Sequence, residues 1–243
     1  MHKVVLITGA ARGIGAATAQ RLAAQGYAVA INYRSQTARA LALCEEITAS
    51  GGVALPFKAD ISVEAEVQAL FEAVTAQLGT VTHLVNNAGI LATQCQFAEL
   101  DLVRWERIFA TNVTGTFLCC REAIKTMPAG GAIVNVSSAA SYTGAPFEYV
   151  DYAASKGAVD SLTKGLAMEL AARQIRVNAV RPGCIETEIH ADGGEPNRVA
   201  RVGQLLPLQR GGTAAEVAAA ITWLLSDEAS YVTGNFIDLA GGR

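Results

Sequence analysis

The sequence is poor in charged residues, and it lacks any run long and apolar enough to cross a membrane. Charged residues make up 17% of the chain, and 19 basic against 22 acidic residues give a formal net charge of −3. No block of basic residues occurs, which argues against nucleic acid or an anionic membrane as a partner. The first apolar stretch, Val4–Ile7, is too short for a signal peptide. We therefore expect a protein that binds neither membranes nor nucleic acid.

The cysteines indicate neither a disulfide framework nor a metal site. They are Cys44, Cys95, Cys119, Cys120 and Cys184. Their number is odd and no Cys-x-x-Cys spacing occurs, so paired bridges and a zinc site are both disfavoured. Nothing else in the sequence resembles a ligand cluster, and we expect no metal. Unpaired cysteines suit a reducing compartment, so we expect a cytoplasmic location.

Apolar residues are plentiful, at 51% of 243 positions, which is enough to bury a large core. Short apolar runs alternate with longer amphipathic stretches. The runs predict strands at Val4–Ile7, Ala28–Asn32, Ala54–Lys58, His83–Val85, Ala132–Val136, Arg176–Val180 and Phe236–Leu239. The stretches predict helices at Ile14–Ala24, Thr37–Ala49, Val63–Gln77, Leu102–Thr126, Ala153–Ala172 and Ala214–Leu225. Most of the runs are apolar throughout, which suits strands covered on both faces.

This alternation predicts an α/β fold with a doubly wound parallel sheet between two helical layers, a three-layer α/β/α arrangement. No linker, repeat or low-complexity tract interrupts it, so we expect a single domain over residues 1–243. The segment Gly183–Gly212 is rich in glycine and proline and poorly periodic. Such a segment is often a lid or a binding loop, and the alternative is a merely solvated loop.

A glycine-rich turn follows the first predicted strand and precedes the first predicted helix. It runs Thr8-Gly9-Ala10-Ala11-Arg12-Gly13-Ile14-Gly15. Glycines let the backbone approach a pyrophosphate closely, and the start of the next helix offers free N–H groups to the anion. The spacing is GxxxGxG rather than the commoner GxGxxG, and an ordinary strand–helix turn is the alternative. Its place in the first βαβ unit favours dinucleotide binding.

The end of the second predicted strand carries information on the cofactor. It reads Ala30-Ile31-Asn32-Tyr33-Arg34-Ser35 and has no carboxylate, the group that holds the ribose 2′-hydroxyl in many NAD sites. Arg34 stands where it could bind a 2′-phosphate, with Arg12 on the other side. The alternative is that both arginines are solvated surface charges. We predict NADP(H) as the preferred cofactor, with NAD(H) as the second choice.

Tyr152 and Lys156 are four residues apart at the start of a predicted helix, so both side chains can point into one cleft. Free tyrosine has a pKa of roughly 10. A nearby cation favours the phenolate, so we expect Lys156 to lower the pKa of Tyr152, with a further effect from an oxidised nicotinamide. The tyrosine could then exchange a proton with an alcohol or carbonyl oxygen. Taken alone this spacing is usually a pair on a helix surface, and its neighbours decide its meaning.

Three further groups are candidates for the site, two of them at strand ends, where the sheet would place ligand contacts. Ser137-Ser138 ends the fifth predicted strand, and Asn86–Gly89 ends the fourth. A serine there could hold a substrate oxygen, although both positions also suit simple turns. Asn112 lies inside the long predicted helix, where an amide is a poor helix former and could kink the helix, hold a water molecule or be satisfied in the core.

As a set, these residues resemble the short-chain dehydrogenase/reductase family in its single-domain form. The matching pieces are Thr8–Gly15, Asp60-Ile61, Asn86–Gly89, Asn112, Ser138, Tyr152 with Lys156, and Arg181-Pro182-Gly183 with Thr187. They occur in the order typical of the family and cover nearly the whole chain. The resemblance implies a Rossmann-type fold and hydride transfer between the nicotinamide and an alcohol or carbonyl carbon.

The resemblance also implies a role for each residue. Asn112, Ser138, Tyr152 and Lys156 would form a catalytic tetrad, in which Lys156 binds the nicotinamide ribose and continues a water-linked proton path with Asn112. Asp60 and Ile61 would contact adenine, Asn87 and Gly89 would line the ribose, and Pro182, Gly183, Ile185 and Thr187 would hold the nicotinamide. The remaining cofactor-binding residues would be Gly9, Ala11, Arg12, Gly13, Ile14, Gly15, Asn32, Tyr33, Arg34, Ser35 and Ala88, with Tyr152.

The family comparison leaves several points open. Ser138 is one residue further from Tyr152 than is usual in the family, so Ser137 stays an alternative and Ser141 a weaker one. Enoyl reductases of the superfamily space their tyrosine and lysine more widely, which disfavours double-bond reduction. We expect a substrate lid at Glu188–Pro207, within which His190, Asp192, Glu195 and Arg198 could meet a polar substrate.

The partner we expect is a small molecule: a sugar, polyol, ketone, aldehyde or 3-oxoacyl compound. The resemblance implies a homotetramer that packs through the helices carrying Asn112 and Tyr152 and through the C-terminal strand region. One alternative is a non-catalytic dinucleotide sensor or scaffold of the same fold. Another is epimerisation or dehydration with a tightly held cofactor, although such relatives usually have a longer C-terminal substrate domain.

Overall fold

The structure, a computed structural model, describes residues 3–243 and is built around a seven-stranded sheet in which all paired strands are parallel. The strand order is β3-β2-β1-β4-β5-β6-β9. All seven predicted strands are confirmed, with small changes at their ends. Their bounds are β1 Val4–Ile7, β2 Ala28–Tyr33, β3 Val53–Lys58, β4 His83–Asn86, β5 Ala132–Val136, β6 Arg176–Pro182 and β9 Phe236–Leu239.

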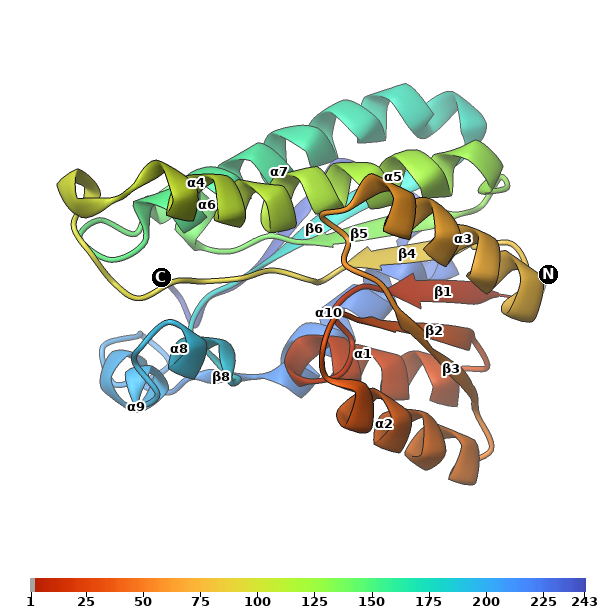
Figure 1. Cartoon of the computed structure of the whole chain (residues 1–243), viewed down its shortest axis with the longest axis horizontal. Helices are drawn as coiled ribbons and strands as arrows, with labels where there is room; N and C mark the ends of the chain where they lie inside the picture. The colour runs from red at the N-terminus through yellow and green to blue at the C-terminus, as the bar shows by residue number, and fades with distance from the viewer. Residues whose placement is uncertain (1–2) are drawn as a thin grey trace.

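Helices cover both faces of this sheet (Figure 1). One layer consists of α1 (Gly13–Ala24), α2 (Thr37–Ala49) and α10 (Ala214–Leu225), and the other of α3 (Glu64–Leu78), α5 (Gly115–Thr126) and α7 (Val150–Leu170). The predicted α/β fold with a doubly wound parallel sheet is thus confirmed.

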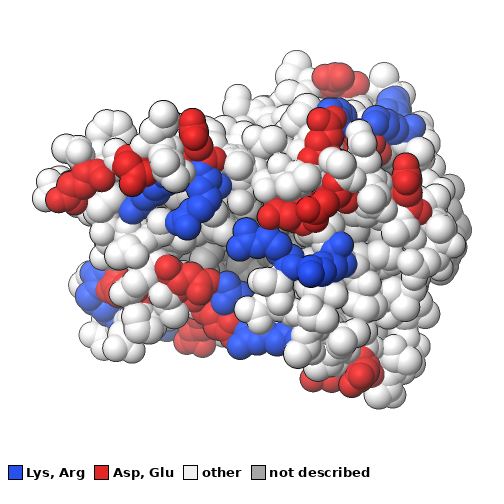
Figure 2. Space-filling view, in the orientation of Figure 1, with Lys and Arg blue, Asp and Glu red and all other residues white. Residues whose placement is uncertain are grey.

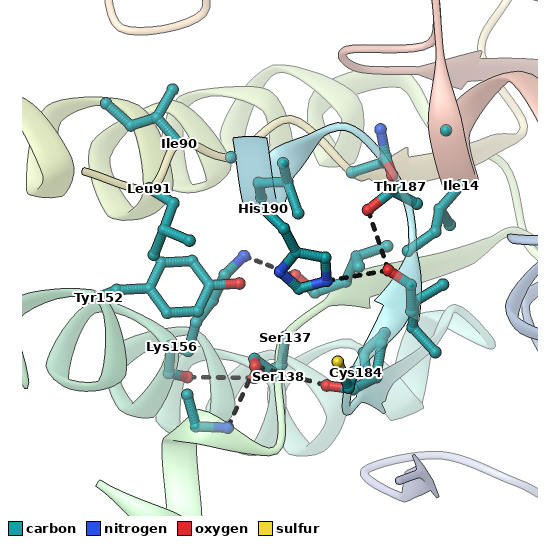
Figure 3. A pocket seen from close by; sticks show the side chains of 18 of the residues that line it. Ile14, Ile90, Leu91, Ser137, Ser138, Tyr152, Lys156, Cys184, Thr187 and His190 are labelled. Atoms are coloured by element: carbon teal, nitrogen blue, oxygen red, sulfur yellow. Dashed lines mark hydrogen bonds between the residues drawn. The ribbon is translucent and has the colours of Figure 1, made fainter. Parts of the chain in front are cut away.

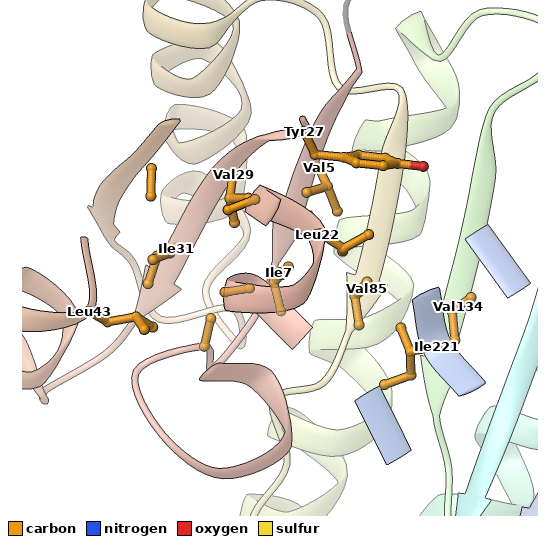
Figure 4. Packing of buried hydrophobic residues seen from close by; sticks show 14 of the residues in the cluster. Val5, Ile7, Leu22, Tyr27, Val29, Ile31, Leu43, Val85, Val134 and Ile221 are labelled. Carbon is orange, nitrogen blue, oxygen red and sulfur yellow. The ribbon is translucent and has the colours of Figure 1, made fainter. Parts of the chain in front are cut away.

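Alternation along β1 shows why a continuous apolar run is needed in such a sheet. Val5 and Ile7 pack under the α1–α2–α10 layer, whereas Val4 and Leu6 pack under the other layer. All four are at most 1% exposed. Figure 4 shows the first of these cores, in which Leu22 of α1 and Ile221 of α10 pack with the strand residues.

The prediction of a single helix over Leu102–Thr126 is wrong in one respect. Its path divides into α4 (Leu102–Phe109), a π-helical turn (Ala110–Thr114) and α5, and the π turn falls at the buried Asn112. A π turn inserts one extra residue into a helix and is often found at functional sites.

The segment Gly183–Gly212 is more ordered than its composition suggested. It holds β7 (Ile185–Glu186), α8 (Ile189–Asp192) and α9 (Arg198–Gly203), and β7 pairs with β8 (Gly212–Thr213) in a separate two-stranded sheet. We call residues 187–211, between those two strands, the cap segment.

The remaining elements are short. They are α6 (Ala140–Thr143) and the 3₁₀ turns Phe97–Glu99, Ala171–Arg173 and Asp227–Ala229. No helix within residues 3–243 is both long and apolar enough to span a bilayer.

Candidate active site

A cavity of about 930 Å³ lies at the carboxyl end of the sheet, beside the reversal of strand order between β1 and β4. All but two of the predicted site residues line it: Gly9, Ala11, Arg12, Gly13, Ile14, Asn32, Tyr33, Arg34, Ser35, Asp60, Ile61, Asn87, Ala88, Gly89, Ser138, Tyr152, Lys156, Pro182, Gly183, Ile185 and Thr187. The exceptions are Gly15 and Asn112, which contact residues of the cavity wall instead. The cap segment supplies part of the wall as well.

The glycine-rich turn is held against the end of β4 with almost no spare room. Gly9 has a φ of +60°, and a Cβ there would lie 2.9 Å from Ala88 Cα. A Cβ on Gly15 would lie 2.6 Å from Asn87 Nδ2. The Asn87 amide nitrogen donates to the Thr8 carbonyl at 2.9 Å and to the Gly9 carbonyl at 3.0 Å. The turn therefore keeps a fixed shape, which requires glycine at both positions.

The start of α1 can receive an anion. Its first turn contains no acidic residue, and its N-cap, Arg12, makes no side-chain capping bond. The N–H groups and the positive end of the helix dipole thus remain available to a pyrophosphate. The residues present fit a dinucleotide at this end of the cavity.

Asn32 supports the turn with its side chain. Its Oδ1 accepts from the Gly9 N–H at 3.4 Å, and its Nδ2 donates to the carbonyls of Phe57 and Ala59 at 3.3 and 3.1 Å. The residue is 2% exposed. Its amide therefore joins the ends of β1, β2 and β3, so that Asn32 positions the turn.

The arginines predicted for the 2′-phosphate are engaged with carboxylates. Arg12 Nη1 donates to Glu188 Oε2 at 2.9 Å, and Nη2 donates to Asp192. Arg34 is 61% exposed and lies 3.8 Å from Asp60 Oδ2. Figure 2 shows acidic and basic side chains intermixed around the hollow on this face of the molecule. The cap segment thus reaches across to the glycine-rich turn through two ion pairs.

Arg39, which the sequence did not indicate as a site residue, also pairs with a carboxylate of the cap segment. Arg39 Nη1 donates to both carboxylate oxygens of Glu188, at 2.8 and 2.6 Å. Hydrogen bonds from Arg12 and Arg39 lower the pKa of Glu188 below its usual range. Arg39 lies in the first turn of α2, five residues after Arg34, and only tertiary structure reveals its partner on the cap segment.

Tyr152 and Lys156 lie one turn apart at the start of α7 (Figure 3). The Lys156 ammonium is 5.5 Å from the centroid of the Tyr152 ring and donates to the Val136 carbonyl at 2.8 Å. Lys156 is 4% exposed. Burial lowers the pKa of Lys156 to about 8, although Asp160 opposes the shift.

The expected lowering of the tyrosine pKa is wrong for the protein without cofactor. Burial raises the pKa of Tyr152 to about 12, and a hydrogen bond with Ser138 opposes this only in part. Desolvation penalises the phenolate more than the neighbouring groups stabilise it. At neutral pH the phenol therefore keeps its proton and can act as an acid.

The three candidate serines differ in their surroundings. Ser138 Oγ accepts from the Ala140 N–H at 3.1 Å and lines the cavity next to Tyr152. Ser137 also lines the cavity, but it is 2% exposed and its hydroxyl donates to the Lys156 carbonyl at 3.3 Å. The Ser141 hydroxyl is buried, and Ser141 is not among the residues that line the cavity. The geometry favours Ser138 for contact with a substrate oxygen.

Asn112 is fully buried and uses its whole side chain to hold neighbouring segments. Its Oδ1 accepts from the Ile90 N–H at 2.8 Å, and its Nδ2 donates to the Ile90 carbonyl at 3.1 Å and to Ser155 Oγ at 3.0 Å. Ser155 precedes Lys156 on α7. Asn112 therefore joins the loop after β4 to the helix that carries the tyrosine and the lysine.

The end of β6 and the cap segment form a further part of the cavity wall. A Cβ on Gly183 would lie 2.9 Å from Ala240 Cα, so this turn is as tightly packed as the glycine-rich one. Gly193 rests against Leu91, where a Cβ would lie 2.7 Å from Leu91 Cδ2. The cap segment thus lies directly on the loop that follows β4.

The Asp, Glu and Arg residues of the cap segment all form ion pairs, some within the segment and some with neighbouring elements. Arg198 pairs with Glu195 at 3.0 Å and also with Glu148, and it is 13% exposed. Arg201 pairs with the same two carboxylates. Of the four residues predicted to meet a polar substrate, Asp192, Glu195 and Arg198 are thus engaged in ion pairs. The fourth, His190, is 8% exposed and lines the cavity.

Within residues 3–243 no three His, Cys, Asp or Glu residues are grouped so that they could hold a metal ion. The polar residues that line the cavity carry hydroxyls, amides, arginines, one lysine, one histidine and the carboxylates of Asp60, Glu148 and Glu188. The arginines and the lysine suit a phosphate-bearing organic ligand.

Comparisons with known proteins agree with this geometry. A family model described as enoyl-(acyl carrier protein) reductase matches residues 9–243. The chain is 58% identical over 245 residues to an uncharacterized oxidoreductase, YgfF, of Escherichia coli K12, with 99% of each chain covered. It is 42% identical over 247 residues to 3beta-hydroxysteroid dehydrogenase 1 of Eggerthella lenta, covering 99% of this chain and 93% of that protein.

Solved structures are similar over the whole chain. One is a blue fluorescent protein from a metagenomic library in complex with NADPH. It has a TM-score of 0.92 and 37% sequence identity, with 99% of this chain and 97% of that chain covered.

Proposed function

The chain belongs to the short-chain dehydrogenase/reductase family of oxidoreductases, and we propose that it transfers a hydride between NADP(H) and an alcohol or carbonyl carbon of a small substrate. The observation that carries this proposal is the convergence of Ser138, Tyr152 and Lys156 on the cavity that the glycine-rich turn also lines. The four-residue spacing of Tyr152 and Lys156 favours carbonyl over double-bond reduction.

The protonation states suit carbonyl reduction at neutral pH. Tyr152 donates its proton to the carbonyl oxygen, because its raised pKa keeps the phenol protonated until charge develops on that oxygen. Ser138 holds the same oxygen by a hydrogen bond. Lys156 provides positive charge beside the phenol and stabilises the phenolate that forms. When bound, the reduced nicotinamide supplies the hydride.

The remaining residues shape the site. The glycine-rich turn and the start of α1 would hold the pyrophosphate, and the end of β6 would hold the nicotinamide. Asn112 positions Ile90 and Ser155 and so fixes the distance between the loop after β4 and α7. Residues 188–207 of the cap segment would act as the substrate lid.

Two observations support NADP(H) over NAD(H). The end of β2 carries Arg34 and no carboxylate. Arg12 and Arg39 both donate to Glu188 of the cap segment, so that positive charge is gathered near this end of the cavity. The similar structure with 37% identity is a complex with NADPH. We expect kcat/KM to be higher with NADPH than with NADH, and a ratio that favours NADH would contradict this choice.

We further propose a cytoplasmic homotetramer. All five cysteines are free, which suits a reducing compartment. Phe117 on α5 and Met168 on α7 are exposed apolar side chains on the adjacent helices expected to pack between subunits, with 43% and 83% exposure. Light scattering coupled to size exclusion would test the assembly, and a monomer would contradict it.

The central test follows NADPH consumption over a panel of sugars, hydroxy-ketones, diketones, aldehydes and 3-oxoacyl thioesters. We expect Tyr152→Phe to lower kcat by about 10²–10⁴-fold, the usual contribution of a positioned proton donor. Tyr142→Phe is the matched control, because Tyr142 is half-exposed on α6 and its hydroxyl bonds only to the Arg243 carbonyl. Near-normal kcat in Tyr152→Phe would refute the mechanism. Tight NADPH binding with no turnover on any carbonyl would favour a dinucleotide sensor.

A further inference from the structure

His190 presents an unsatisfied hydrogen-bond acceptor inside the cavity. It belongs to α8 of the cap segment, is 8% exposed, and lines the same cavity as Tyr152. Figure 3 shows its imidazole in the middle of the view, with Thr187 on one side and Tyr152 on the other. The side chain is therefore part of the site rather than of the protein surface.

One hydrogen bond fixes which ring nitrogen carries the proton. His190 Nε2 lies 2.9 Å from the Ile185 carbonyl, which can only accept. Nε2 must therefore be the donor. Burial lowers the pKa of His190, and the positive charge of Arg198 acts in the same direction. The ring is thus neutral at pH 7, and its second nitrogen, Nδ1, carries a lone pair.

Nδ1 of His190 has no hydrogen-bond partner among residues 3–243, although the atom is buried. A buried acceptor without a donor is unfavourable, so such a group in a binding cavity calls for a donor from the ligand. Among the polar side chains of this region, Arg198 and Gln94 donate to Glu195, and the Tyr149 hydroxyl, which also lines the cavity, makes no hydrogen bond to His190. Leu91, Val202 and Leu206 are among the apolar residues that line the same cavity.

We propose that His190 is a specificity-determining residue that accepts a hydrogen bond from a hydroxyl group of the substrate. This inference rests on the proposed function and narrows its substrate class to carbonyl compounds that also carry a hydroxyl: hydroxy-ketones and hydroxyaldehydes in reduction, and diols or sugars in oxidation. A simple ketone of the same size leaves Nδ1 unpaired and is disfavoured, because sites built to bind a hydroxyl reject analogues without one.

The test compares isosteric substrates in which a methyl group replaces the hydroxyl. The pairs are 1-hydroxy-2-butanone with 3-pentanone and 4-hydroxy-2-butanone with 2-pentanone, so that two hydroxyl positions are sampled. We expect at least one hydroxylated member to be favoured by about 10-fold or more in kcat/KM with NADPH. In His190→Leu this preference should fall to near unity, through loss on the hydroxylated ketone and little change on the simple one.

His190→Asn is the matched control. Its side-chain oxygen can replace Nδ1 as the acceptor, so part of the preference should return, whereas a merely structural role for the ring would leave Asn no better than Leu. The affinity for NADPH is measured in parallel. Equal kcat/KM for both members of each pair in the wild type, or an unchanged preference in His190→Leu, would overturn the assignment. A loss of NADPH affinity with an equal loss on all ketones would assign Nδ1 to the cofactor's carboxamide instead.

A binding measurement separates failure of this inference from failure of the proposed function. In the Tyr152→Phe protein saturated with NADPH, the dissociation constants of the paired ketones are compared with and without His190→Leu. Discrimination that depends on His190 supports the assignment even where no turnover occurs, whereas absence of turnover in the wild type counts against the proposed function alone. Equal dissociation constants within both pairs would overturn the assignment.

Discussion

Glu188 competes with the cofactor for positive charge, which leads to a quantitative prediction. Its carboxylate receives hydrogen bonds from Arg12 at 2.9 Å and from Arg39 at 2.6 and 2.8 Å. If Arg12 and Arg39 bind the 2′-phosphate of NADP(H), they must first release Glu188. The carboxylate is half-exposed, so each ion pair contributes only about 0.2–1 kcal/mol. Two such pairs together oppose phosphate binding by about 0.4–2 kcal/mol.

The substitution Glu188→Gln removes this competition. At 1.4 kcal/mol for each factor of ten, the dissociation constant of NADPH should fall by about 2- to 30-fold. NADH lacks the phosphate, so its dissociation constant should change much less. Both can be measured from the fluorescence of the bound cofactor in titrations at constant ionic strength, because salt screens exposed charges.

The matched control is Glu186→Gln, which removes the same charge from an exposed position two residues away on β7. A net-charge effect would strengthen NADPH binding equally in both variants, whereas direct competition affects only Glu188→Gln. Unchanged or weaker NADPH binding in Glu188→Gln, or an equal gain for NADH, would refute the competition.

Three other predictions follow from particular side chains. Burial lowers the pKa of Lys156 to about 8, so its ammonium is lost as pH rises through that value. The kcat/KM for reduction should then fall above pH 8, by up to tenfold for each pH unit. A flat pH profile up to pH 10 would contradict this. Burial lowers the pKa of His83 to about 4. Between about pH 6.5 and 4 the imidazole is therefore protonated in the unfolded chain but not in the folded protein. The free energy of unfolding should drop by about 3 kcal/mol as pH falls across that window. In denaturant titrations His83→Asn should lose most of this dependence, and an unaltered slope would exclude His83 as its source. Gly15→Ala should weaken NADPH binding more than tenfold at unchanged circular dichroism, because its Cβ would meet atoms at 2.6 and 2.8 Å, whereas the control Gly165→Ala has open space and should bind normally.

The sheet and the glycine-rich turn could be predicted because their signals are local. A run such as Val4–Ile7 is apolar at every position, since alternate residues enter different cores. The turn and the Tyr152–Lys156 pair are short motifs whose geometry follows from a few consecutive residues. Such features need no knowledge of which distant segments meet.

Features that depend on distant contacts could not be predicted. Arg39 and Glu188 are 149 positions apart, and nothing in either local sequence indicates their pairing. The pKa of Tyr152 was expected to fall because Lys156 is near in sequence, but burial by the surrounding segments acts in the opposite direction and is stronger. The π turn at Asn112 likewise depends on Ile90 and Ser155, which satisfy the amide from other parts of the fold.

The pairing of β7 with β8 has a consequence for the energetics of catalysis. Because Ile185 pairs with Gly212 and Glu186 with Thr213, the two ends of the cap segment are joined at its base. Bringing together the ends of a flexible loop of this length costs about 3 kcal/mol in chain entropy. Here that cost is met when the protein folds, so a substrate that enters beneath the segment does not have to meet it again. More of the substrate's binding energy then remains for stabilising the transition state.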